Sequence, residues 1–194
     1  MRNRFQVSLF LLCCFLAAGA ECHAQAIPTA SRIADLQIGG SFVIAEPGYS
    51  TLNADGTTPM FRGAGFYATF DPRYHFGAEV GFHQVSTSLS DQSYERTYEI
   101  GARYFRDYGK FVPYAKVMFG RGVYNYANNV ANLAYNLIGP AAGVDFHATR
   151  RINVRLDYEY QMWLNFLPPG GMHPQLFSVG VAYHFPGELR VDKR

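Results

Sequence analysis

Charge is scarce in this 194-residue chain, in which only 16% of residues are Asp, Glu, Lys or Arg. The 17 basic and 15 acidic residues leave a formal charge of +2, too weak and too mixed in sign for a nucleic-acid-binding protein. Tryptophan occurs once, but 14 Tyr and 16 Phe make the composition too aromatic for a disordered chain. The apolar residues are spread too evenly for a helical membrane protein. These absences leave one ordinary domain or two very small ones.

The only concentrated apolar run lies at the N-terminus, between Leu9 and Ala20, after a basic start that includes Arg2 and Arg4. A bilayer-spanning helix takes ~20 apolar residues, so this run is too short to be one. Small residues at its end fit a signal peptidase site. We predict a secretory signal over residues 1–24, cleaved after Ala24 or alternatively after Ala26.

Cysteine is missing from the rest of the chain. All three cysteines, Cys13, Cys14 and Cys22, leave with the predicted signal. Glu21 precedes Cys22 where a lipoprotein has a small residue, so we expect no lipid anchor. A small secreted domain with no disulfide must be stabilised by other means.

Alternation with a period of two recurs along the mature chain, whereas helical periodicity is never sustained. In residues 152–161, for example, apolar and aromatic side chains alternate with polar ones such as Arg155, Asp157 and Glu159. Eight strands are predicted in total. They cover residues 34–45, 61–70, 74–85, 93–105, 110–122, 137–147, 152–163 and 176–185.

The gaps between these strands alternate between long and short. Short gaps carry turn chemistry such as Asp71-Pro72, and long gaps are rich in Asn, Gly and Pro, as in residues 53–56 and 168–171. Short turns at one end and long loops at the other are typical of a bacterial outer-membrane barrel. The predicted fold is therefore all-β: an eight-stranded antiparallel up-and-down transmembrane β-barrel over residues 34–185.

The polar face of the strands decides between a membrane barrel and a soluble lipocalin-like carrier, whose inward face would be apolar. The polar face combines charged residues with glycines, as expected for an interior only just wide enough for side chains. Its charged members are Glu79, Glu99, Arg103, Lys116, Asp145, Arg155, Asp157 and Glu159. Aromatic residues gather near both strand ends of the apolar face, as in the interfacial girdles of membrane barrels. The composition favours the membrane barrel, with the carrier as the alternative.

The chain resembles the small outer-membrane β-barrel proteins that include the transmembrane domain of OmpA and the opacity and NspA-like barrels. The resemblance covers about residues 34–185, nearly the whole mature chain, and rests on pattern more than on invariant motifs. The last strand, residues 178–185, looks like the signal that the barrel-assembly machinery recognises, with Gly180, Tyr183 and Phe185 as its elements. In most family members the terminal aromatic residue ends the chain, whereas here a polar periplasmic tail, residues 186–194, follows it. A short periplasmic segment, residues 25–33, is expected before the barrel.

One strand departs from the expected pattern. Pro140 lies inside a predicted strand, and proline removes a donor from the hydrogen-bond ladder. We therefore expect a bulge or a late strand start at this position.

The charged interior residues have two interpretations. They form an ion-pair network that simply fills a narrow barrel, or they form the gate of a low-conductance pore, as the resemblance implies. The first is favoured because charges in a confined core must be paired or solvated.

Few residues suggest catalysis or metal binding. His75, His83, His147 and His184 fall on different strands and at different heights, so no metal site and no cofactor are expected. An enzyme acting on lipid A would need a His–Ser arrangement, and the nearest candidate is His83 with Ser86, Ser88 or Ser90. Neither an acidic partner for it nor a hydrolase motif is evident.

The sequence therefore predicts a non-enzymatic barrel in the outer membrane of a Gram-negative-type bacterium, with a structural or loop-display role. A low-conductance pore or a conduit for small apolar ligands is the alternative, and the soluble carrier is the second alternative. The expected partners are outer-membrane lipid, lipopolysaccharide and, during biogenesis, the barrel-assembly machinery.

Overall fold

The computed structural model describes residues 34–48, 60–72, 75–87, 93–125, 131–165 and 171–185. The chain divides into two units, Met1–Ser31 and Arg32–Arg194, and the first lies outside the described residues. The predicted signal (1–24), N-terminal segment (25–33) and tail (186–194) lie outside them as well. No described helix is long and apolar enough to cross a membrane.

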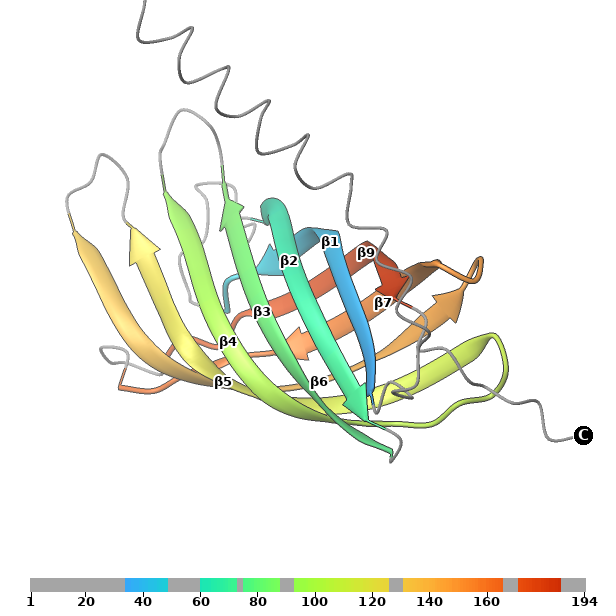
Figure 1. Cartoon of the computed structure of the whole chain (residues 1–194). Helices are drawn as coiled ribbons and strands as arrows, with labels where there is room; N and C mark the ends of the chain where they lie inside the picture. Colours follow the sequence, from blue (N-terminus) through green and yellow to red (C-terminus); the bar gives the residue numbers. More distant parts are fainter. Residues whose placement is uncertain are drawn as a thin grey trace, which may run out of the picture. The chain divides into compact units, whose positions relative to one another are not determined.

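The described residues of the second unit form one antiparallel sheet that closes on itself (Figure 1). Its strands follow one another around the ring, and the first strand pairs with the last. The strands are β1 (Ala34–Glu46), β2 (Phe61–Pro72), β3 (Phe76–Ser86), β4 (Tyr94–Phe105), β5 (Phe111–Asn125), β6 (Asn132–His147), β7 (Ile152–Tyr160), β8 (Met162–Trp163) and β9 (Gln175–Phe185). The predicted eight-stranded barrel is confirmed, because β7 and β8 are two parts of one strand.

The break between β7 and β8 lies opposite Pro140. Ala141 pairs with Glu159 and Ile138 pairs with Met162, so the register is the same on both sides of the break. At the break, Gln161 donates its backbone N–H to the carbonyl of Pro174 on the other side. Pro140 therefore has no strand partner on this side, where its missing N–H would otherwise be needed.

The expected bulge or late strand start at Pro140 is wrong. β6 begins at Asn132, and its pairing with β5 passes Pro140, opposite Val117, without any offset. The loop between β5 and β6 is shorter than predicted, because β5 also continues to Asn125. Asp71 and Pro72 likewise belong to β2 rather than to a turn.

The strand registers define the stagger of the barrel. A row of paired residues that starts at Ala142 on β6 passes through Tyr158, Phe177, Ile44, Arg62, Ser86, Tyr94 and Asn125. It returns to β6 at Asn132, ten residues from its start. Each strand is therefore offset from its neighbour by a little more than one residue, which tilts the strands as barrel closure requires.

The distribution of exposed residues settles which face is inside. Large apolar side chains on the outward face are exposed, including Phe66 at 63% and Ile100 at 61%. Charged side chains point inward and are buried, such as Arg103 at 1% and Glu79 at 2%. This is the reverse of a soluble carrier, so the lipocalin-like alternative is wrong. The apolar exterior is the surface that a tilted strand presents to lipid.

Candidate functional sites in the lumen and at the outer rim

Seven charged residues fill the barrel interior toward the short-turn end, and we call them the ionic layer. They come from six consecutive strands, β2 to β7, and each is at most 6% exposed. The members are Asp71, Glu79, Arg103, Lys116, Asp145, Arg155 and Asp157. Six of them were predicted from the sequence as polar-face residues; Asp71 was missed because it was assigned to a turn.

Arg155 lies at the centre of the ionic layer. Its Nε and Nη2 donate to the two oxygens of Asp145 at 2.7 and 3.0 Å, and its Nη1 donates to Glu79 at 2.9 Å. Its guanidinium also lies 3.9 Å from the centre of the Tyr67 ring. Bidentate pairing and stacking use the planar guanidinium in ways that a lysine cannot.

The other two cations complete the ionic layer. Lys116 Nζ lies 2.7 Å from Glu79 Oε1 and 3.1 Å from Asp157 Oδ2. Arg103 Nη2 donates to Asp145 at 2.9 Å, and its Nε lies 3.6 Å from Asp71. All three cations are therefore held by carboxylates.

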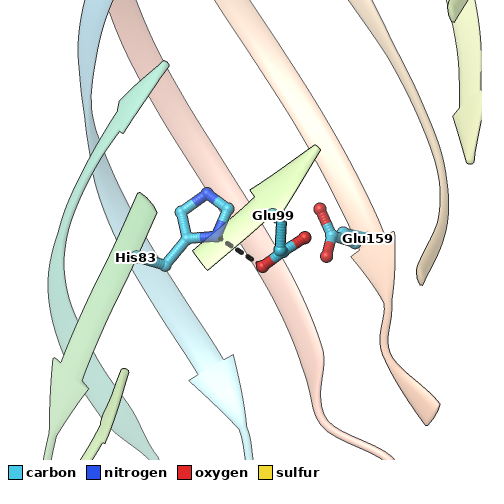
Figure 2. A group of neighbouring side chains, drawn as sticks. All are labelled: His83, Glu99 and Glu159. Carbon is cyan, nitrogen blue, oxygen red and sulfur yellow. Dashed lines mark hydrogen bonds and ion pairs between the residues drawn. The ribbon is translucent and has the colours of Figure 1, made fainter. Parts of the chain in front are cut away.

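Glu99 and Glu159, also predicted as part of the polar face, do not join this layer by any ion pair among the described residues. They lie together nearer the long-loop end, beside His83, and we call these three residues the His83 triad (Figure 2). The side-chain amide of Gln161 donates to Oε1 of both carboxylates, at 2.9 Å for Glu99 and 2.8 Å for Glu159.

Beyond the triad, the interior becomes mainly apolar apart from the buried Glu95 and Asn125, which the sequence analysis did not anticipate. Nine buried side chains close the lumen at the long-loop end, and we call them the apolar layer. They are Val43, Ala45, Phe61, Val85, Tyr124, Leu137, Trp163, Met172 and Leu176. The signal was present in the sequence, because inward positions change along β3 from Glu79 through Gly81 and His83 to Val85.

The prediction that the four histidines lie at different heights is wrong for His147 and His184. The rings of His147 and His184 stack 5.8 Å apart at the short-turn end. His184 pairs with Asp35, and His147 hydrogen-bonds to Asn153 at 2.8 Å. Strand stagger brings this pair together, and spacing in the sequence does not report it.

The His–Ser candidate does not assemble among the described residues. His83 points inward and contacts Glu99 and Thr97. Ser86 lies on the opposite face of β3, because side chains alternate along a strand. Ser88 and Ser90 lie outside the described residues.

Three arginines on the outward face form an arginine belt: Arg62, Arg96 and Arg121. The paired row through Arg62 meets β4 at Tyr94 and β5 at Asn125. Because of the stagger, this paired row rises toward the outer rim by a little more than one residue per strand. The position level with Arg62 is therefore about two and a half residues below Tyr94 on β4 and about four residues below Asn125 on β5. Those positions are Arg96 and Arg121, so the belt lies at one height near the outer rim.

Gln84 on β3 fills the gap in the arginine belt, and Arg96 donates two hydrogen bonds to it, at 2.8 and 3.0 Å. Two residues below lie the outward aromatic rings of Phe82, Tyr98 and Phe119. The rings of Phe82 and Tyr98 are 5.2 Å apart. A second aromatic group occupies the short-turn end, where Phe76 and Tyr104 are 5.1 Å apart. Cations above an aromatic girdle are placed to reach lipid phosphates.

The predicted assembly residues all lie on β9. Gly180 points inward, where an added Cβ would lie 2.9 Å from the carbonyl of Gly40 and 3.2 Å from the Tyr67 ring. Tyr183 and Phe185 are in edge-to-face contact, with ring centres 4.7 Å apart. Gly180 therefore has a packing role, and the two aromatic residues are part of the girdle at the short-turn end.

A closed antiparallel barrel with an apolar exterior, aromatic girdles and a charged interior defines an outer-membrane β-barrel protein. A comparison with family models agrees with this class: the model described as "Outer membrane protein beta-barrel domain" matches residues 10–185. The chain belongs to this family and is located in the outer membrane of a Gram-negative bacterium. A comparison with curated proteins gives no match.

Solved structures share the fold at low sequence identity. Neisserial surface protein A (NspA) aligns with a TM-score of 0.55 at 16% identity, over 78% of this chain and 97% of that one. The outer membrane protein OprG from Pseudomonas aeruginosa aligns with a TM-score of 0.57 at 14% identity, over 78% and 96%. Ail of Yersinia pestis, solved with the heparin analogue sucrose octasulfate, gives 0.53 at 14% identity, over 78% and 97%.

Proposed function

We propose that this protein is a non-enzymatic, closed barrel that displays its long loops outside the cell and contributes to the structure of the envelope. The observation that carries the proposal is the filling of the lumen by two different layers. Phe61, Leu137 and Trp163 in the apolar layer are each at most 2% exposed, as are Arg103 and Arg155 in the ionic layer. A solute crossing the barrel would have to displace both layers.

Conductance across a planar bilayer tests the closed lumen. We expect the purified full chain to insert without producing current steps. Defined current steps from wild-type protein would overturn the proposal and favour the low-conductance pore. Arg155→Ala would then show whether the ionic layer is the gate, because a gate variant should change the open probability.

We further propose that lipopolysaccharide is the lipid partner of the outer rim, through the arginine belt. Lipopolysaccharide carries phosphates in the outer leaflet, and Arg pairs with phosphate by two hydrogen bonds. The belt spans four neighbouring strands, β2 to β5, which is wide enough to contact more than one phosphate group.

Replacing all three belt arginines by Gln tests this contact. We expect the variant to retain less lipopolysaccharide after detergent extraction than the wild type, and to be stabilised less when lipopolysaccharide is added. A matched triple variant, Arg106→Gln, Arg150→Gln and Arg151→Gln, removes the same charge from exposed positions at the short-turn end. Equal losses in both variants would show that only net charge matters and would contradict a belt site.

During biogenesis, we propose that β9 serves as the recognition element for the barrel-assembly machinery, with Tyr183 and Phe185 as the aromatic positions. Support comes from their outward placement at the end of the last strand, where a partner strand can reach them before the barrel closes. Replacing Tyr183 and Phe185 by Ala should slow insertion in cells more than it slows refolding in detergent. Equal slowing in both settings would indicate a packing role alone.

A further inference from the structure

The buried charges of the described barrel do not balance. Seven carboxylates are buried in its interior: Asp71, Glu79, Glu95, Glu99, Asp145, Asp157 and Glu159. The buried cations are Arg103, Lys116 and Arg155, and all three are held in the ionic layer. Near the long-loop end, Glu95, Glu99 and Glu159 therefore lie in a low-dielectric interior with no ion pair to any described Lys or Arg, and Lys116 acts on Glu159 only from a longer distance. This arrangement is costly unless something compensates the charge.

The lack of positive charge is greatest at Glu99 and Glu159, because these two carboxylates lie next to each other. Both are at least nine-tenths buried, and Oε2 of each has no hydrogen-bond partner. Figure 2 shows the carboxylate of Glu99 between the His83 ring and the carboxylate of Glu159. Two adjacent buried carboxylates cannot both remain ionised unless a cation lies between them; without one, they share a proton.

The geometry points to a divalent metal ion at the His83 triad, and we propose that this protein binds one Zn²⁺ there. One histidine nitrogen and two carboxylate oxygens are donors that zinc accepts in proteins. The donor atoms lie within 4.8 Å of one another, and His83 Nδ1 lies 3.4 Å from Glu99 Oε1. Ligands of a tetrahedral zinc ion are roughly 3.4 Å apart, given zinc–ligand distances near 2.1 Å.

Glycines on the neighbouring strands leave room for this group. An added Cβ at Gly139 would lie 2.8 Å from Oε1 of Glu159, and one at Gly120 would lie 2.8 Å from Cγ of Glu99. At Gly81 the nearest atoms to such a Cβ are 3.7 Å or more away, one of them in the His83 ring. The missing side chains at these positions therefore leave the space that the two carboxylates and the imidazole occupy.

Two further polar side chains, Thr97 and Gln161, contact the triad. Thr97 Oγ1 lies 3.3 Å from His83 Nδ1, so an ion bound at this nitrogen takes the place of the Thr97 contact. The amide of Gln161 donates to Oε1 of both carboxylates, which leaves their unpartnered Oε2 atoms for the ion. Three protein ligands leave a fourth position for water, and the apolar layer separates the site from the long-loop end. An ion bound here therefore neutralises the carboxylate pair and fastens β3, β4 and β7 to one another.

The test is to refold the full chain from urea into detergent with Zn²⁺ present, because the finished barrel encloses the site. After dialysis against metal-free buffer, we expect about one Zn²⁺ per chain by inductively coupled plasma mass spectrometry. Refolding with Co²⁺ should give the visible absorption bands of a low-symmetry nitrogen and oxygen site. His83→Gln and Glu159→Gln should each lose at least tenfold in retained metal.

Two control variants are matched in chemistry and burial. Glu95→Gln removes another buried carboxylate from β4, and His147→Gln removes another partly buried inward histidine. Both should retain the metal of the wild type. Equal metal loss in these controls, or no retained metal in the wild type, would overturn the proposal and leave a shared proton between Glu99 and Glu159.

A second measurement uses only wild-type protein, in case a variant fails to fold. Protein refolded with Zn²⁺ should unfold at a higher urea concentration than protein refolded in EDTA, because an ion that binds only the folded state stabilises it. Identical unfolding midpoints for the two preparations would contradict the site independently of any substitution.

Discussion

Arg155 illustrates how single residues stabilise this interior. It contacts two carboxylates and an aromatic ring, and it is 2% exposed. A buried ion pair adds little net stability over apolar packing, but removing one partner leaves an uncompensated charge. Replacing Arg155 alone should therefore destabilise the barrel more than replacing Arg155 and its partners together by apolar residues.

We expect Arg155→Ala to reduce the free energy of unfolding by about 3–5 kcal/mol, because Glu79 and Asp145 each lose one of their buried cations. Urea titration of the barrel in detergent measures this loss. Arg106→Ala is the control, because this arginine is exposed and its replacement should leave the unfolding transition close to that of the wild type. A similar small effect at both positions would show that the ionic layer is solvated rather than buried.

Trp163 is the only tryptophan of the chain and lies in the apolar layer. Its ring fills the space above Gly122, where an added Cβ would lie 2.3 Å from Cζ2. We expect Gly122→Ala to displace the ring, to cost about 1–3 kcal/mol by overpacking, and to shift the fluorescence emission to longer wavelength.

Gly40→Ala is the matched control for this substitution. The nearest atoms to a Cβ at Gly40 are 3.7 Å away, an ordinary contact. The emission maximum should therefore stay where it is in the wild type. An unchanged spectrum in Gly122→Ala as well would contradict the tight packing of Trp163.

At the scale of strands, depth in the membrane decides what a substitution costs. Val179 pairs with Leu156 in the middle of the apolar band. Val154 pairs with Val181, and the stagger between the two strands places it lower than that partner, close to the level of Tyr183 in the girdle at the short-turn end. Arginine on the lipid face costs about 2–4 kcal/mol at the midplane and about 0–1 kcal/mol near the interface.

We therefore expect Val179→Arg to destabilise the barrel substantially more than Val154→Arg, although both replace an outward valine on neighbouring strands. Urea unfolding in lipid vesicles gives the two free energies. Equal losses would mean that the apolar band is centred elsewhere on the strands.

Period-two alternation was sufficient to predict the eight strands and their inward faces, because lipid and lumen select side chains independently on each face. The ends were less predictable. Asn132 and Asn136 have the composition of a loop, yet they pair with Asn125 and Arg121 because β5 continues beside them. Tertiary pairing here overrides local preference.

The His83 triad was beyond what the sequence could predict. Its members come from β3, β4 and β7, and 60 residues separate the two carboxylates in the chain. Only the ten-residue stagger of the closed barrel brings them to the same height. Alternation gives the face on which each residue lies, but it does not give the stagger.

For the whole molecule, the pairing of β1 with β9 is what closes the ring. The absence of cysteine after position 22 allows a direct test of this seam. Gly40 and Val181 are partners across it, both on the outward face. We expect Gly40→Cys with Val181→Cys to form a disulfide on oxidation, since paired residues in adjacent strands are close enough for one.

The crosslinked barrel should keep its fast electrophoretic mobility in SDS at temperatures that unfold the reduced form. Gly40→Cys with Val179→Cys is the control, because Val179 pairs with Phe42 instead. Efficient crosslinking of the control pair would indicate a different register at the seam.

The position of the ionic layer relative to this seam bears on the order of assembly. Every member lies between β2 and β7, so β1 and β9, which form the seam, bring none of its charges. Next to the layer these strands instead present Gly39 and Gly180, each close to the Tyr67 ring. A curled, still open sheet can therefore complete its ion pairs first. Pairing of β1 with β9 then breaks none of these ion pairs. The contact between His184 on β9 and Asp35 on β1 adds a further link across the seam.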